Sequence, residues 1–314
     1  MSRPSASLAQ RQSHAGSEMI EVSDGLYAYT NPRGGWCVSN AGVLVGRDGV
    51  TLIDSTATQP RAQLLKDEVG LLTSAPVRSI ITTHHHGDHH YGAATFRPGA
   101  TVIAHDRARD CIIEDGLNLQ AFWPDAQWGD VQIVPPDITF ADRLTVYVDD
   151  LRAELIHFGP AHTTNDIVAW FPDRRVLFTG DLTFSGGTPF CLMGSVAGAL
   201  TAIEQLRALE PETVVSGHGP VAGPEVFDVN AGYLAWIQRL AAAGLAAGLD
   251  PLSAAREADL GEYAGLLDPE RVVGNLHRAY AEALGGTLGD RLDIVAAFTD
   301  MVVYNDGKVP TCLA

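Results

Sequence analysis

Metal-binding chemistry is indicated first by residues 83–90 (THHHGDHH), where five histidines and one aspartate lie within eight residues. This stretch follows an apolar run, residues 77–81, whose β-branched side chains predict a buried strand. Imidazoles suit zinc and iron, and an aspartate adds a charged oxygen ligand. A solvated histidine-rich loop or an affinity tag is the alternative, but tags lie at chain ends and lack the Gly-Asp step. The candidate ligands are spaced so that one strand end can serve two neighbouring metal positions: His84, His86, Asp88 and His89.

Three later segments, each beside a predicted strand, present one further candidate ligand each: His162, Asp181 and His218. Glycines beside them permit a close approach of the backbone. Together with the histidine stretch, they complete a two-metal site in which each ion keeps an open position, as catalytic sites require. The predicted assignment is His84, His86 and His162 on one ion, Asp88, His89 and His218 on the other, and Asp181 as the bridge.

The carboxylate of Asp54 is a candidate support for the histidine stretch. Residues 41–45 and 50–53 predict two strands joined by a turn whose Asp-Gly step favours a positive φ. The second strand ends at Asp54, where a carboxylate can accept a hydrogen bond from a ligand imidazole. The alternative is that Asp54 belongs to the N-terminal cap region of the helix predicted over residues 59–72.

The composition excludes several classes of protein. The formal net charge of −17 argues against a nucleic-acid partner, which requires a basic surface. No apolar run approaches the length of a membrane span, so we expect no membrane association. Residues 1–17 are polar and lack the apolar segment of a signal peptide, which predicts a disordered leader. Four scattered cysteines without a Cys-x-x-Cys motif indicate single thiols in a reducing compartment, and hence a cytoplasmic protein.

The last third of the chain is predicted to be helical. Residues 224–248, 251–260, 269–284 and 288–301 are rich in Ala and Leu, and several of these segments open with Pro or a capping residue. We therefore divide the chain into the leader (1–17), a metal-binding domain (18–223) and a helical C-terminal extension (224–314). The extension is expected to cover the metal cleft or to form the contact of a homodimer.

The ordered motifs resemble those of the metallo-β-lactamase fold superfamily. Residues 83–89 resemble its histidine loop, and residues 160–163, 178–181 and 216–219 resemble its later motifs. The resemblance covers about residues 19–220. It implies an α/β protein with the αββα sandwich of that fold, metals at one edge between the sheets, and hydrolase chemistry. The expected cofactors are two zinc ions, with iron or manganese as alternatives.

Asp181 separates this chain from the zinc β-lactamases, which lack the bridging aspartate. It resembles the glyoxalase II, lactonase and thioesterase branches instead, so we do not expect antibiotic hydrolysis. Residues 190–195 (FCLMGS), 274–280 (GNLHRAY) and 300–305 (DMVVYN) carry a narrower resemblance. They are similar to the second-ring cyclase/thioesterases of aromatic type II polyketide biosynthesis, of the actinorhodin type.

The resemblance implies a thioesterase that releases an aromatic polyketide from a carrier-protein thioester and can close a ring. Two cations would polarise a carbonyl and activate a water molecule, and Asp88 would orient that water and accept its proton. Aromatic side chains are expected to flank a flat substrate, although each alone is typical of a core position. The candidates are Trp36, Trp123, Trp128, Phe184 and Phe190.

Other functions fit the same residues. The second enzymatic hypothesis is a glyoxalase II-like or lactonase-type hydrolase of small thioesters, esters or lactones. The non-hydrolytic hypothesis is an iron-dependent oxygenase or redox protein, and the non-enzymatic hypothesis is a metal-stabilised scaffold. An acyl carrier protein is the expected partner. Because such a partner is acidic, we expect a local basic patch, for which Arg107 and Arg109 are candidates unless they form a plain solvated helix face.

Overall fold

The computed structural model describes residues 11–12 and 16–314. Most of the leader predicted over residues 1–17 lies outside the described residues. Of its described part, Arg11–Gln12 pairs with the next strand as β1, and the Ser17 hydroxyl donates a hydrogen bond to Asn31. No helix in the described part of the chain is both long enough and apolar enough to cross a membrane.

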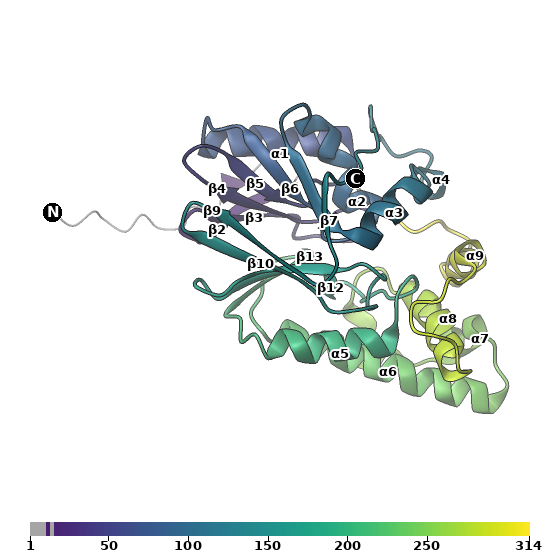
Figure 1. Cartoon of the computed structure of the whole chain (residues 1–314). Helices are drawn as coiled ribbons and strands as arrows, with labels where there is room; N and C mark the ends of the chain where they lie inside the picture. Colours follow the sequence, from purple (N-terminus) through teal and green to yellow (C-terminus); the bar gives the residue numbers. More distant parts are fainter. Residues whose placement is uncertain (1–10, 13–15) are drawn as a thin grey trace.

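Two β-sheets form the centre of the molecule (Figure 1). Within the described residues, the first sheet has eight strands in sequence order: β1 (Arg11–Gln12), β2 (Glu18–Ser23), β3 (Leu26–Thr30), β4 (Ala41–Val45), β5 (Val50–Ile53), β6 (Val77–Ile81), β7 (Thr101–His105) and β8 (Ile138–Phe140). The second has five, in the order β13 (Thr213–His218), β12 (Val176–Phe184), β11 (Ile167–Phe171), β10 (Leu151–His157) and β9 (Arg143–Val148). Strands β5 to β8 are parallel, and so are β12 and β13, so their carboxyl ends gather at one edge of each sheet.

Helices cover the outer face of each sheet, as Figure 1 shows for α1 on one side and α5 and α6 on the other. The described helices are α1 (Gln59–Leu72), α2 (Gly87–His90), α3 (Asp106–Asp115), α4 (Leu119–Phe122), α5 (Val196–Arg207), α6 (Val226–Ala247), α7 (Pro251–Glu257), α8 (Arg271–Ala283) and α9 (Ile294–Tyr304), with the 3-10 segments η2 (Tyr91–Phe96) and η3 (Gly261–Gly265). The layers run helix, sheet, sheet, helix. The αββα sandwich expected from the sequence is therefore confirmed.

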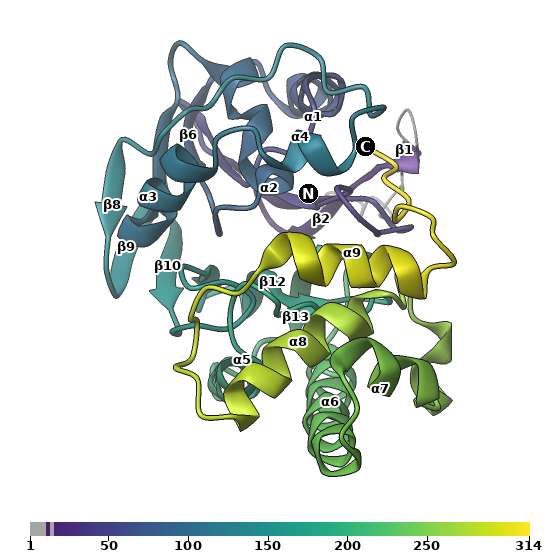
Figure 2. The same cartoon turned by 90° about the vertical axis from the view of Figure 1, so that its right-hand side faces the viewer.

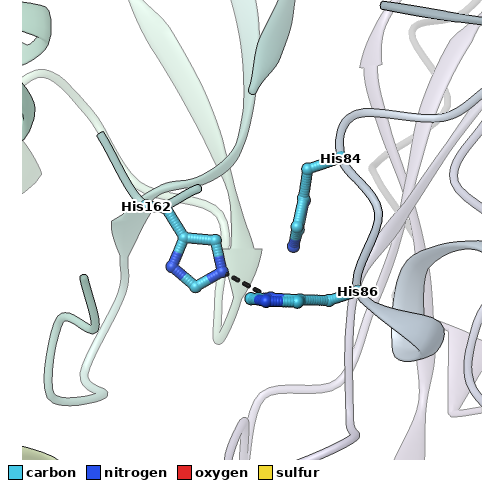
Figure 3. A group of neighbouring side chains, drawn as sticks. All are labelled: His84, His86 and His162. Atoms are coloured by element: carbon cyan, nitrogen blue, oxygen red, sulfur yellow. Dashed lines mark hydrogen bonds between the residues drawn. The ribbon is translucent and has the colours of Figure 1, made fainter. Parts of the chain in front are cut away.

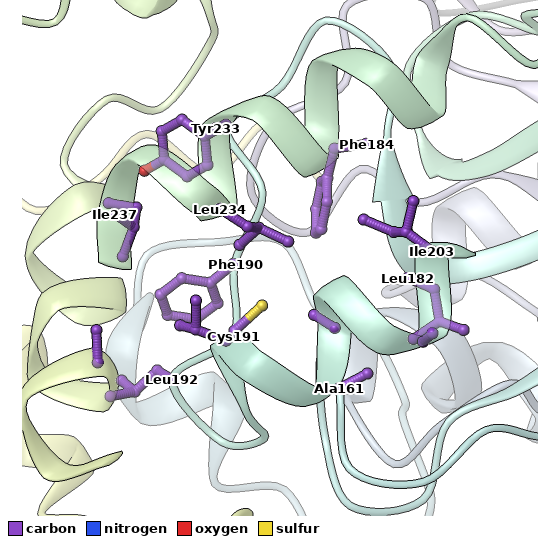
Figure 4. Close-up of a cluster of buried hydrophobic side chains, with 14 of the residues drawn as sticks. Ala161, Leu182, Phe184, Phe190, Cys191, Leu192, Ile203, Tyr233, Leu234 and Ile237 are labelled. Atoms are coloured by element: carbon purple, nitrogen blue, oxygen red, sulfur yellow. The ribbon is translucent and has the colours of Figure 1, made fainter. Parts of the chain in front are cut away.

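Three apolar clusters hold these layers together. Residues such as Ile53 and Phe178 fill the space between the two sheets. Leu65 and Val69 of α1 pack on the outer face of the first sheet. The largest cluster lies beyond the second sheet, where α5, α6 and α8 meet β12, and Figure 4 shows part of it. Each sheet is thus buried on both faces, which agrees with the nearly continuous apolar runs of β5, β11 and β12.

The helices after residue 224 do not form a separate body. Phe227 and Leu234 of α6 are buried in the same cluster as Ile203 of α5. In Figure 2, α9 lies across the junction of the two halves, and the tail after it runs back to the first sheet. That tail is held there because the Trp123 indole N–H donates to the Pro310 carbonyl oxygen at 2.7 Å.

Candidate metal centre

The histidine stretch begins where β6 ends. Residues 82–86 leave the sheet as a loop, and α2 then places Asp88 and His89 one turn further along. Gly87 lets the Tyr91 ring pack against this turn, because a Cβ there would lie 2.4 Å from that ring. His162 comes from the loop after β10, and His218 is the last residue of β13. Strand β12 is longer than the sequence predicted, so Asp181 lies inside it at a register shift and does not follow its end.

Two glycines, one in β12 and one in β13, make room around the Asp181 carboxylate and its strand. A Cβ at Gly217 would lie 1.8 Å from Asp181 Oδ1. Gly180 has φ +51, and a Cβ there would lie 2.8 Å from the Thr83 side chain. Gly217 therefore lets β13 approach the Asp181 carboxylate, and Gly180 lets β12 approach Thr83 at the start of the histidine stretch.

All seven predicted ligands come together. The side-chain ligand atoms form three groups, and the atoms of each group lie within 4.8 Å of one another. The groups are His84, His86 and His162; His84, His89 and Asp181; and Asp88, His89 and His218. Figure 3 shows the three imidazoles of the first group pointing toward one another. Asp181 lies near ligands predicted for both ions, since its Oδ2 is 3.3 Å from His162 Nε2 and 3.3 Å from His218 Nε2.

Hydrogen bonds to the far side of each ring determine which nitrogen faces the centre. His162 Nδ1 lies 2.5 Å from the Phe190 carbonyl oxygen, so that nitrogen carries the proton and Nε2 carries the lone pair. His86 is turned the other way, because its Nε2 contacts Met193 Sδ at 3.1 Å. Thr83 donates its hydroxyl proton to Asp54, which leaves that hydroxyl oxygen to accept from His84 Nδ1 at 3.1 Å.

His86 Nδ1 and His162 Nε2 are 2.8 Å apart and are joined by the dashed line in Figure 3. With the proton of each ring on its opposite nitrogen, both atoms would present lone pairs to a cation instead. His84 Nε2 is buried and has no hydrogen-bond partner among the described residues. Buried polar atoms without partners are costly, and a cation at their common point would satisfy all three. The residues therefore fit a metal ion.

Asp54 supports the other side of the centre. Its Oδ2 accepts a hydrogen bond from His89 Nδ1 at 2.8 Å, so His89 Nε2 faces Asp181 Oδ1 at 3.2 Å. The same carboxylate also accepts from the backbone N–H and the hydroxyl of Thr83. Both His89 Nε2 and Asp181 Oδ1 lack hydrogen-bond partners in the described part of the chain. The carboxylate–histidine arrangement expected from the sequence is thus present, and it orients His89.

The charges of the centre divide into two kinds. Burial holds the pKa values of His84 and His86 well below the ordinary 6.5, and that of His162 at about 4, so these rings are neutral and able to bind metal. Burial also acts against a charge on His218, but the Asp181 and Asp88 carboxylates raise its pKa to about 9. Asp88 is itself held ionised, because His89 and His218 lower its pKa against the effect of burial. A second cation would replace the proton of His218.

Comparison with known proteins identifies the family. The model of the Metallo-beta-lactamase superfamily matches residues 34–218, more than half of the chain. The chain belongs to this superfamily. A metallo-beta-lactamase type 2 of Bacteroides fragilis is 26% identical over 239 residues, which cover 72% of this chain and 89% of that protein. A hydroxyacylglutathione hydrolase of Synechococcus is 31% identical over 173 residues, 52% of this chain and 57% of that protein.

The fold of the superfamily also appears among solved structures. A metallo-beta-lactamase from Erythrobacter litoralis matches with a TM-score of 0.58 at 18% sequence identity, over 71% of this chain and 97% of that one. The match to the family model confirms the superfamily resemblance predicted from the motifs, and members of that superfamily are mostly metal-dependent hydrolases. At this identity the solved structure indicates the fold alone.

An aromatic cavity opens beside the ligand groups. Its walls include four of the five aromatic residues predicted to contact substrate, namely Trp36, Trp123, Phe184 and Phe190. Trp128 is not among the lining residues. It is 7% exposed and packs with Tyr91, and its indole N–H donates to the Trp123 carbonyl oxygen. Helix α9 adds Ile294, Phe298 and Met301 to the wall, so the C-terminal extension contributes to this cavity. Its two expected roles, as a cover of the metal cleft or as the contact of a homodimer, stay predictions.

Other histidines and the two candidate docking arginines lie outside the ligand groups. His85 meets Asn165 through its backbone N–H, which donates to the side-chain oxygen at 3.1 Å. His105 caps α3 by accepting from the Arg107 backbone N–H. On the same helix Arg107 is exposed, whereas Arg109 is half-buried and donates to the Pro136 carbonyl oxygen.

Sequence reasoning missed three groups at the centre. The Phe190 carbonyl and the Met193 sulfur orient His162 and His86, and Arg271 lines the cavity. A backbone carbonyl carries no sequence signal. Arg271 was hidden inside an amphipathic helical pattern, where an arginine is expected on the solvent face.

Proposed function

We propose that this chain is a dinuclear metallohydrolase that cleaves acyl thioesters, and that its substrate is an aromatic polyketide held on an acyl carrier protein. The observation that carries the proposal is the cavity itself. It joins a centre of seven candidate ligands to a wall of aromatic rings, including Trp36 and Phe190, whose centroids are 5.2 Å apart. Such a wall suits a flat, conjugated acyl group.

The chain's own residues divide the work as follows. Divalent cations bound here, zinc in our proposal, would supply Lewis acidity to polarise an acyl carbonyl and to activate water. Asp88 is ionised and 8% exposed, and its Oδ2 lies 3.4 Å from His218 Nε2, so it can hold a water molecule in place and accept its proton. Asp54 keeps His89 oriented, and the Phe190 carbonyl does the same for His162. The aromatic wall excludes bulk water from the acyl group.

Substrate panels test the reaction. We expect metal-loaded protein to hydrolyse an aryl or β-ketoacyl pantetheine thioester at least about a hundredfold faster, in kcat/KM, than a β-lactam. The released thiol can be followed directly, and mass spectrometry of the product detects ring closure. Equal or faster turnover of the β-lactam would refute the proposal.

A second hydrolase function is favoured by one specific observation. Hydroxyacylglutathione hydrolases recur among the relatives, and the name describes hydrolysis of an acylglutathione. If a small hydroxyacyl thioester or a lactone were cleaved orders of magnitude faster than the aryl thioester, this second function would replace the first. Iron found in active protein, together with oxygen consumption, would point instead to redox chemistry.

The carrier protein and its docking site are part of the proposal. Arg107 is exposed on α3, but the helix also carries Asp106, Asp110, Glu114 and Asp115. Carrier-bound substrate should therefore be compared with the free pantetheine thioester in the wild type and in Arg107→Glu. A selective loss with the carrier-bound substrate supports docking at α3. Equal rates in the two proteins exclude Arg107 from the docking site.

A further inference from the structure

Arg271 is a buried cation in the wall of the metal cavity. It is the first residue of α8 and is 2% exposed, yet it lines the same cavity as Asp181 and His218. Among the described lining residues it is the one permanently charged cation. In a chain with a net charge of −17, a buried arginine beside the reactive centre requires a reason.

Aromatic rings hold the guanidinium in position. Its carbon lies 4.3 Å from the centroid of the Trp36 ring and 5.0 Å from that of Phe184. Phe184 in turn stacks on His218, with centroids 5.4 Å apart and planes 11° apart. Arg271 is therefore separated from a candidate metal ligand by a single ring. The Trp36 indole N–H donates to the Glu270 carboxylate at 2.7 Å, which fixes the tryptophan against the same helix end.

The hydrogen bonds of Arg271 are incomplete. One terminal nitrogen donates to the Thr188 carbonyl oxygen at 3.0 Å, and the other pairs with the Asp268 carboxylate at 3.0 Å. The Nε–H group is buried and has no partner among the described residues. A buried donor without an acceptor is destabilising, so an oxygen of a bound ligand that reached Nε would stabilise this side chain.

We propose that Arg271 selects substrates by binding an anionic oxygen on a flat acyl group. The ring system of the substrate would lie along the wall of Trp36 and Phe190 while a carboxylate or an ionised β-keto oxygen accepts from Arg271 Nε. A charge-assisted hydrogen bond inside a cavity discriminates well against a neutral analogue. This inference rests on the proposed function for the identity of the acyl group, but the binding site is defined by Arg271 itself.

The test measures binding and needs no turnover. Calorimetry on metal-loaded protein compares 2,6-naphthalenedicarboxylate with its monoamide, since the two ligands differ by one charge. The metal centre can hold the carboxylate that both ligands share. We expect the wild type to bind the dicarboxylate at least about tenfold more tightly than the monoamide. Arg271→Met should abolish this preference and leave affinity for the monoamide within about threefold.

Arg239→Met is the matched control, because Arg239 is an exposed arginine on α6 and the same charge is removed outside the cavity. It should keep the full preference. Arg271→Lys retains a positive charge but lacks the Nε–H donor, so it should keep only part of the preference for the dicarboxylate. This variant tests the inference if Arg271→Met does not fold. A wild type without the preference, or an Arg271→Met or Arg271→Lys protein that keeps all of it, would overturn the inference. If the preference behaves as expected but no thioester is hydrolysed, the proposed function fails and the anion site stands.

Discussion

At the residue scale, the candidate centre depends on the far side of each imidazole. Asp54, the Phe190 carbonyl and Met193 each occupy one ring nitrogen of a histidine, so the other nitrogen faces the cavity. Such partners fix the ring orientation before any metal arrives, and losing one typically weakens metal affinity tenfold to a hundredfold. The pKa directions add that three of the rings are already neutral near pH 7.

Substitution of Asp181 and of His218 should affect metal content differently. Asp181 has one oxygen near His89 and the other near His162 and His218, so it lies beside ligands predicted for both ions, whereas His218 is predicted to bind one ion alone. We expect about two metal ions per wild-type chain, about one in His218→Ala, and losses at both positions in Asp181→Ala. Elemental analysis of protein purified without chelator measures this. Normal metal content and turnover in Asp181→Ala would show that it is not a bridge.

The pH dependence of stability should contain a contribution from Asp166. Burial raises the pKa of this carboxyl from 3.8 to about 7, although it accepts two hydrogen bonds from Thr163. Because the folded-state pKa lies above the unfolded value, its stabilising contribution is full below about pH 4 and is lost as pH rises through 7. The free energy of unfolding of the wild type should therefore fall, relative to Asp166→Asn, between pH 4 and 7.

Urea denaturation of metal-saturated protein across that range measures the difference between the two proteins. Metal saturation is needed because the histidines of the centre would otherwise titrate in the same window. Parallel pH profiles for wild type and Asp166→Asn would contradict the prediction.

At the scale of elements, the distance between β12 and β13 decides whether Asp181 can face the histidines. Gly217→Ala would put a Cβ 1.8 Å from Asp181 Oδ1, so the carboxylate or the strand must move. We expect a loss of about 1–3 kcal/mol in the free energy of unfolding, as in other overpacked sites, together with reduced metal content. Calorimetric unfolding and elemental analysis measure both.

Gly70→Ala provides the control for that substitution. Gly70 is exposed in α1, and a Cβ there would have no neighbour within 4 Å. Replacing it should leave metal content unchanged and raise stability by about 0.5–1 kcal/mol, the usual gain from alanine inside a helix. A Gly217→Ala protein that resembled this control would show that the strands can separate without harm.

Local signals explain why most elements could be predicted from the sequence. Strands β5 and β6 are specified by their own apolar runs, and the turn before β5 is specified by its Asp-Gly step. These local patterns depend little on contacts with distant parts of the chain. Boundaries set by other parts of the chain could not be predicted. Strand β12 continues past Gly180 because β13 pairs with it as far as Phe184 and His218. Helix α9 begins at Ile294, later than predicted, because the Asp293 side chain caps it by accepting from Ala296 N–H.

In the candidate site, too, features set by local sequence could be predicted, and features set by distant contacts could not. Its candidate ligands could be proposed because several histidines and aspartates, with glycines beside them, recur at strand ends along the chain. One such residue alone is not enough, since His105 at the end of β7 caps a helix. Its substrate wall could be predicted only in part. Trp36 and Glu270 are 234 residues apart, and their contact depends on how α8 packs, which no local pattern specifies. Trp128 has the same residue type as Trp36 but packs away from the cavity lining.

At the scale of the whole molecule, the C-terminal helices should be inseparable from the metal-binding part. They share the largest apolar cluster with α5 and β12, and α8 and α9 supply part of the cavity wall. A chain ending at Pro220 would expose the buried face of α5, including Ala199, Ile203 and Leu206. An apolar surface of this kind favours aggregation. We therefore expect the truncated protein to be insoluble, or soluble only as inactive aggregates that bind a hydrophobic dye. Expression of both forms, followed by sedimentation and metal analysis, measures this outcome.

Supplying residues 221–314 as a second polypeptide should recover soluble, metal-binding protein, because the contacts removed are those between the two parts and not those within either one. A truncated monomer that is soluble and fully active by itself would show instead that the helices after residue 224 form an independent unit.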